Sequence, residues 1–293
     1  MTAYPIDHLV LPTTSLHAAR ERLGKLGFTV ATDARHPFGT ENACVFLADK
    51  TYLEPLAVTS VEACQAAVAD GNVFVARDQA YRFRVGEEGL LALVFLTSDA
   101  DGDDERFRRD AVSAGRLLEF SRPMRLPDGR EAVGSFRLAF AADLRSPDFF
   151  AFNCERVNQL PSDRAALESH ANGVVGLSKV VLSTPRPAAF STFIGTISNG
   201  AVPLPHSFGI GFQTPNVNVE ILDDGGMEAF FDAAPVSDDS GLRGRAIVFR
   251  VVDLSVTEAH LAANGVTYTR KNNTILVKAA PGQGALFAFE ETA

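Results

Sequence analysis

A loop and a strand of this chain recur in its second half. The loop His36-Pro-Phe-Gly39 is echoed by His206-Ser-Phe-Gly209, and Glu54, in Tyr52-Leu-Glu-Pro-Leu-Ala-Val58, is echoed by Glu220 in Val217-Asn-Val-Glu-Ile-Leu222. Self-similarity of this kind arises when a chain repeats one supersecondary unit. The sequence therefore predicts a duplicated architecture, and 46% hydrophobic against 22% charged residues supply apolar material for its cores.

The first 58 residues predict the order βαβββ. Ser15 is placed to cap a helix, and Gly27 follows the last residue of its apolar face. The expected elements are a strand over 6–11, a helix over 16–26 and strands over 28–32, 43–48 and 52–58.

Three further cycles of the same order can be laid along the chain, after a connecting helix over 61–69 and irregular chain up to residue 89. The second has a strand at 90–96, a helix at 104–114 and strands at 116–120, 131–141 and 149–154. The third has a strand at 177–182, a helix at 188–198 and strands near 201, 208–213 and 216–222. The fourth has a strand at 245–252, a helix at 255–263 and strands at 266–269, 274–278 and 285–290. The prediction is an α+β fold of four βαβββ modules in two halves, 1–160 and 173–293, joined by a linker at 161–172.

Charge and composition exclude several classes of partner. A net charge of −9 disfavours binding to nucleic acid. No apolar run is long enough to cross a membrane, and the first residues lack the pattern of a signal peptide, so we expect a cytoplasmic protein. Its expected partner is a small-molecule ligand or substrate, and the sequence also allows a homodimer.

Cysteine and glycine spacings exclude further possibilities. Three cysteines are an odd number, and we expect buried thiols at Cys44, Cys64 and Cys154 and no disulfide framework. The glycines at Gly209-Ile-Gly211 and Gly282-Gln-Gly284 lack the spacing of a phosphate-binding loop. No nucleotide cofactor is therefore expected.

Aligning the four modules brings polar residues to repeated strand positions. The closing strands align Glu54, Asn153, Glu220 and Glu290. The opening strands align His8, Ala92, Lys179 and Arg245 or Ala246. The first module alone has a pair, His8 and Glu54, of the residue types that bind metals.

The same residues carry a family resemblance. Asp7-His8-Leu-Val, Lys25-Leu-Gly-Phe28, His36-Pro-x-Gly39-Thr40-x-Asn42, Tyr52-Leu-Glu54 and His170-x-Asn172-Gly173 resemble the glyoxalase-like family of the vicinal oxygen chelate superfamily. The resemblance implies paired modules that curl into open barrels around a pocket. It also implies a divalent metal ion (Zn, Fe, Mn or Ni) held by His8 and Glu54, with Asn153 as a weak third ligand or a substrate contact. Ala92 departs from the family pattern because it cannot bind a metal.

The residues themselves leave alternatives open. A buried carboxylate needs a cation or a hydrogen-bonded partner, so His8 and Glu54 form either a metal site or a satisfied pair. His36 is the candidate general base or donor to a substrate oxyanion. Thr40, Asn42 and Tyr52 are candidate substrate contacts, although Thr40 and Asn42 also suit a role in fixing the loop. His206 lacks a partner like His8, which favours a structural role.

Two functions from different classes follow. The first is a small-molecule enzyme, a lyase, isomerase or dioxygenase, with its site in the first half. The second is a binding or sequestration protein of the bleomycin-resistance type. A third possibility is that the second half, with Lys179 and Arg245, is a scaffold that serves interaction or stability. Arg122, Arg125 and Arg130 fit an anionic substrate or a solvated loop equally well.

Overall fold

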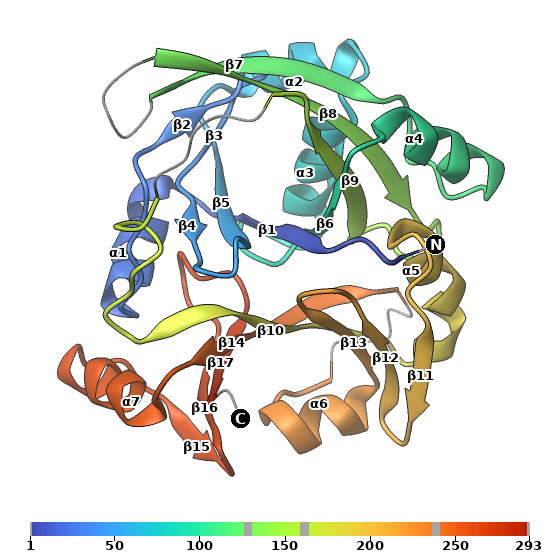
Figure 1. Cartoon of the computed structure of the whole chain (residues 1–293). Coiled ribbons are helices and arrows are strands. Elements are labelled where there is room, and N and C mark those ends of the chain that lie inside the picture. The colour runs from blue at the N-terminus through green and yellow to red at the C-terminus, as the bar shows by residue number, and fades with distance from the viewer. Residues whose placement is uncertain (1, 126–130, 159–163, 236–240, 292–293) are drawn as a thin grey trace.

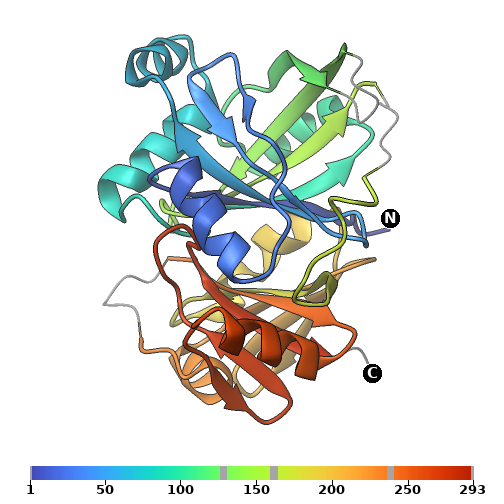
Figure 2. The same ribbon diagram turned by 90° about the vertical axis from the view of Figure 1, so that its left-hand side faces the viewer.

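Two mixed β-sheets lie one above the other in the computed structural model, which describes residues 2–125, 131–158, 164–235 and 241–291 (Figures 1 and 2). The chain completes the first sheet before it begins the second. Each sheet combines the strands of two βαβββ modules. The predicted α+β fold of paired open-barrel halves is confirmed.

The first sheet is built outward from two central antiparallel strands, β1 and β6, each of which has a parallel neighbour. Its strand order is β2 (Ala34–Arg35), β3 (Thr40–Asn42), β5 (Tyr52–Val58), β1 (Ile6–Pro12), β6 (Ala92–Thr97), β9 (Phe150–Arg156), β8 (Glu131–Ala142) and β7 (Leu118–Arg125), and β4 (Val45–Phe46) also pairs with β5.

The second sheet repeats this connectivity, with β10 and β14 at its centre. Its order is β11 (Pro203–His206), β12 (Gly209–Gln213), β13 (Asn218–Leu222), β10 (Val174–Ser183), β14 (Arg243–Val251), β17 (Leu286–Glu291), β16 (Thr274–Val277) and β15 (Thr269–Lys271). Because the same parallel and antiparallel neighbours recur, positions in one sheet can be matched to positions in the other.

Helices pack against both faces of the sheets, some with the shared core and others on the opposite, concave faces (Figure 1). The helices of the first half are α1 (Leu16–Lys25), α2 (Val61–Ala69), α3 (Val73–Arg84) and α4 (Ala100–Arg109). Those of the second half are α5 (Ser191–Ile197), which continues a 3₁₀ turn at Pro187–Phe190, α6 (Asp224–Phe231) and α7 (Leu254–Ala263). None of the described helices is long and apolar enough to span a membrane.

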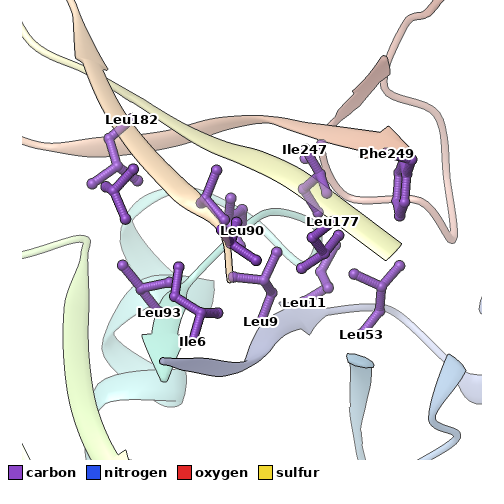
Figure 3. Close-up of a cluster of buried hydrophobic side chains, with 14 of the residues drawn as sticks. Ile6, Leu9, Leu11, Leu53, Leu90, Leu93, Leu177, Leu182, Ile247 and Phe249 are labelled. Carbon is purple, nitrogen blue, oxygen red and sulfur yellow. The ribbon is translucent and has the colours of Figure 1, made fainter. Parts of the chain in front are cut away.

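One apolar core joins the two halves (Figure 3). Leu9 and Leu11 of β1 and Leu93 of β6 belong to the same buried cluster as Leu177 of β10 and Ile247 of β14. Side chains alternate along a strand, so the intervening residues point to the opposite face of each sheet. Each half therefore has its own concave face, turned away from the shared core, where polar side chains can gather.

The structure corrects one strand prediction in the first module and the prediction of irregular chain in the segment that follows it. Residues 28–32 are not a strand, because Thr29 bonds to His170 and Ser169, in the chain that connects the halves. The chain after 69 is not irregular, since α3 begins after the capping residue Asn72. Its buried face carries Asp78, paired with Arg82, and this interrupts the apolar periodicity.

Two further helices differ from the prediction. The helix expected at 104–114 is α4, which begins at Ala100 because the Asp99 side chain accepts a hydrogen bond from the amide of Gly102. Helix α6 was not predicted, since the two glycines near its start weaken its helical signal. The three cysteines are free and buried, as expected.

Candidate functional site

His8 and Glu54 are brought together by the pairing of two parallel strands. In the register of β1 with β5, Val10 lies opposite Glu54 and His8 opposite Tyr52. His8 and Val10 share one face of β1, and that face points away from the shared core. The two candidate metal ligands therefore meet on the concave face of the first sheet.

A chain of charged side chains runs from Glu54 through the buried His8 and Asp7 to the more exposed Arg156. His8 Nε2 lies 3.2 Å from one oxygen of Glu54, and His8 Nδ1 lies 2.8 Å from Asp7. Arg156 bonds to the other oxygen of Asp7. An irregularity in the pairing of β1 with β6, between Ile6 and His8, lets the Asp7 carboxylate reach the imidazole of its neighbour.

His36 approaches the same carboxylate from the loop before β3. Its Nδ1 lies 2.9 Å from the Thr40 hydroxyl, and its Nε2 lies 3.4 Å from the Asn42 amide nitrogen and 3.6 Å from Glu54 Oε1. Asn42 donates a hydrogen bond of 2.6 Å to that same oxygen. The structure thus gathers five of the predicted site residues, His8, His36, Thr40, Asn42 and Glu54, around one buried carboxylate.

The surroundings push the pKa values of the two imidazoles apart. Burial lowers the pKa of His36 to about 4, and Arg122 and His8 add to this effect against the opposing charge of Glu54. Burial also acts to lower the pKa of His8, but hydrogen bonds and charges from Asp7 and Glu54 outweigh it and raise that pKa. The same pairing lowers the pKa of Glu54 to about 2 despite its burial. These shifts favour a neutral His36 beside a protonated His8 that pairs with Glu54.

Tyr52 and several phenylalanines wall the site. The Tyr52 ring stacks on His8 at 4.4 Å between ring centroids, and burial raises the pKa of its phenol. Phe38 stacks on His36 at 5.0 Å, and Phe120 meets that imidazole edge-on at 5.9 Å. These walls leave a cavity of about 40 Å³, which has room for only a few water-sized atoms.

Arg122 contributes a hydrogen-bond donor that no other described residue uses. This residue of β7 lines the cavity and donates a bond of 3.4 Å to Asn42 Oδ1. Its Nε is buried and has no hydrogen-bond partner in the described part of the chain. A buried guanidinium N–H without a partner is costly and is suited to an oxygen of a ligand. Of the other two arginines singled out above, Arg130 and the Arg125 side chain lie outside the described residues.

Asn153 does not join the site. It is fully buried on the opposite face of β9, where its amide donates a bond of 2.8 Å to Asp103 of α4. The strand register shows why: Glu54 pairs with Val10, and the corresponding pair in β6 and β9 is Val94 with Phe152. The alignment of the closing strands by sequence was therefore one residue out of register. A shift of one residue turns a side chain to the other face of a sheet. Phe152 occupies the expected position and lines the cavity.

Three polar site residues were missed by the sequence reasoning as partners of the centre. Asp7 was noted only as part of a motif, and Arg156 lies at the end of β9, close to the expected linker. For Arg122, the sequence left two alternatives open, a contact with an anionic substrate and a place in a solvated loop. A useful signal was that Asp7 and Arg156 are charged residues in or next to buried strands, where a charge needs a partner.

The donor set does not fit a metal site. Across the ranges that the structure describes, no group of three or more His, Cys, Asp or Glu side chains is placed to hold a metal ion. Both oxygens of Glu54 already accept hydrogen bonds, from His8 and Asn42. Both ring nitrogens of His8 likewise face carboxylates, Nδ1 at 2.8 Å from Asp7 and Nε2 at 3.2 Å from Glu54. Of the two alternatives for His8 and Glu54, the geometry is that of the hydrogen-bonded pair.

Comparison with known proteins identifies the family. The model of a glyoxalase-like domain matches residues 6–196, and the chain belongs to this family. This match contains every residue of the site described above. A search of curated proteins finds no match.

Solved structures show the same fold at low sequence identity. A hypothetical protein from Staphylococcus aureus has a TM-score of 0.66 at 10% identity, covering 98% of this chain and 99% of its own. A mutant 4-hydroxymandelate synthase from Streptomyces coelicolor has a TM-score of 0.63 at 14% identity, covering 99% and 93%. A Mn(II)-bound glyoxalase from Novosphingobium aromaticivorans has a TM-score of 0.55 at 10% identity, covering 99% and 82%. These likenesses concern the whole duplicated fold.

Proposed function

We propose that the first half binds a small oxygen-bearing molecule and catalyses proton transfer on it, as an isomerase or a lyase does. One observation carries the proposal: two imidazoles converge on one buried carboxylate, and their pKa values are shifted in opposite directions. Titratable groups whose surroundings separate their pKa values mark acid and base roles.

The proposed step uses His36 as the base. With its pKa lowered to about 4, His36 is neutral at pH 7, so one of its ring nitrogens carries a lone pair. His36 takes a proton from the carbon next to a carbonyl group, the C–H electron pair forms a C=C bond, and the carbonyl oxygen becomes negative. Arg122 donates to that oxygen through its unused N–H. The proton then returns from His36 to the substrate.

His8 and Glu54 position the base in this scheme. The ion pair fixes the Glu54 carboxylate, which together with Asn42 holds the Nε2 side of His36. The small cavity, which Phe120, Arg122 and Phe136 of β7 and β8 help to line, limits the substrate to a few heavy atoms.

Proton exchange in D₂O tests this function. The protein is incubated with pyruvate or hydroxyacetone, and loss of the α-proton signals is followed by NMR. We expect exchange above the buffer rate, a fall of about 100-fold in His36→Gln, within the usual contribution of a general base, and no change in His206→Gln. Exchange at the buffer rate for both probes, or a His36→Gln variant as active as the wild type, would overturn proton transfer.

Binding without chemistry is the second candidate. It is favoured by the fact that both Glu54 oxygens have protein donors before any ligand arrives. In this case, calorimetry detects saturable binding of the same probes, and Arg122→Gln weakens it, while the α-protons do not exchange.

A further inference from the structure

A second and larger hollow lies on the concave face of the second sheet. Its volume is about 500 Å³, against about 40 Å³ in the first half. Pockets for small molecules in proteins typically measure about 300 to 1,000 Å³. Strands β10, β13 and β17, helix α6 and the turn between β15 and β16 contribute its walls. Most of its lining residues lie beyond residue 196, where the family match ends.

The charged residues of this pocket occupy positions that correspond to those of the first site. Val181 pairs with Glu220 as Val10 pairs with Glu54, and Lys179 precedes Val181 by two residues as His8 precedes Val10. An ammonium group therefore takes the place of the imidazole. The recurring histidine, His206, lies 3.1 Å from Glu220 through its Nε2.

The two lysines that line this pocket pair with carboxylates other than Glu220. Lys179 binds Glu290 at 3.0 Å, and Lys271 binds Asp232 at 2.5 Å. Glu220 is bonded to His206, whose Nδ1 accepts a hydrogen bond of 3.3 Å from the amide of Phe208. An imidazole that accepts at Nδ1 and donates at Nε2 is neutral. Among the described residues, no lysine or arginine forms an ion pair with Glu220, so its carboxylate is available to a cationic donor in the pocket.

Two partly exposed aromatic rings line the same pocket as this carboxylate. Phe208 and Phe230 meet edge-to-face at 5.2 Å and are 36% and 48% exposed. The floor is apolar, with Val181, Leu222 and Val248. Aromatic faces attract cations, and exposed aromatic side chains around a concave surface are typical of ligand sites. Gly211 adds room, because a Cβ there would lie 3.0 Å from Glu220 Oε1.

We propose that the pocket of the second half binds a small organic ammonium ion that carries an apolar or aromatic body. The ammonium group donates to Glu220 beside Phe208 and Phe230, and the body lies on the apolar floor. This site is independent of the function proposed for the first half. It replaces the interpretation of the second half as a scaffold, and it gives His206 the role of orienting Glu220.

Three probes with the same body and different charges test the proposal. Phenethylammonium, phenethyl alcohol and 3-phenylpropanoate are titrated into the full chain by isothermal titration calorimetry. We expect phenethylammonium to bind at least about tenfold more tightly than the alcohol, because a hydrogen bond to a charged group is stronger than a neutral one. We expect the propanoate to bind more weakly than either. Equal affinities, tighter binding of the propanoate, or no binding by any probe overturns the proposal.

Variants then locate the site. Glu220→Gln keeps the shape of the side chain and is expected to weaken phenethylammonium about tenfold, with a change of less than about twofold for the alcohol. Phe230→Ala removes a half-exposed ring and is expected to weaken both probes. Glu258→Gln is the matched control, since Glu258 pairs with Arg270 outside the pocket and its loss should change neither affinity. Preference for the ammonium probe that survives in Glu220→Gln contradicts the assignment.

Discussion

The two halves present the same arrangement of strands with different contents. In the first half, His8 and Glu54 are buried in a hydrogen-bonded centre, and phenylalanines close it to about 40 Å³. In the second half, Lys179 and Glu220 stand at the matching positions in a pocket of about 500 Å³. The shared core needs only the alternate residues of the central strands to stay apolar. The concave faces were thus free to diverge while the scaffold was retained.

The largest expected difference concerns the two matching glutamates. Glu54→Ala leaves the buried His8 and Asp7 without their third charged partner and should lower the free energy of unfolding by about 3 to 5 kcal/mol. Glu220→Ala removes a partly exposed pair with His206 and should cost no more than about 1 kcal/mol. Urea denaturation of both variants measures the difference. Equal losses would mean that the second centre is as tightly coupled to folding as the first.

The next expected effect is the pH dependence of stability. Folding lowers the pKa of His36 from 6.5 to about 4, so between these values the unfolded chain binds a proton that the folded chain does not. Stability from His36 is therefore present above pH 6.5 and is lost as pH falls towards 4, by up to about 1.4 kcal/mol per pH unit.

The matched variants isolate this contribution. In His36→Gln, the slope of the unfolding free energy against pH between pH 6.5 and 4 should decrease by up to about 1.4 kcal/mol per pH unit, which corresponds to one bound proton. Urea denaturation at a series of pH values measures this slope. His206→Gln in the open pocket is the comparison. An unchanged slope in His36→Gln would show that the folded protein protonates His36 as readily as the unfolded chain does.

The repeat in the sequence was sufficient to predict the fold, because each module carries local signals such as helix caps and apolar strands. Ser15 caps α1 as expected, and the apolar strands recur in the right order. Helix α3 was missed because Asp78 and Arg82 satisfy each other on its buried side, and only the folded structure shows that pairing. Local patterns report propensity, whereas a buried ion pair depends on tertiary contacts.

The site was predictable where one module supplies it. His8, His36, Asn42 and Glu54 lie within 50 residues of one another and meet through the pairing of β1, β3 and β5. Asn153 was assigned to the wrong face because the sequence alone does not fix the register of paired strands, and a shift of one residue turns a side chain to the opposite face. Arg122 reaches the site from β7 through long-range sheet pairing, for which the sequence holds no local signal.

The smallest expected effect concerns Lys179, which stands where the first half has His8. Lys179→Met breaks a pair with Glu290 in which both side chains are partly exposed, 35% and 27%. Such pairs contribute little because water screens them, so urea denaturation should show a loss of no more than about 1 kcal/mol. The methionine keeps the length and apolar stem of the lysine. A loss of several kcal/mol would show that Lys179 holds the second sheet together as His8 holds the first, and the two concave faces would then differ in volume but not in their coupling to folding.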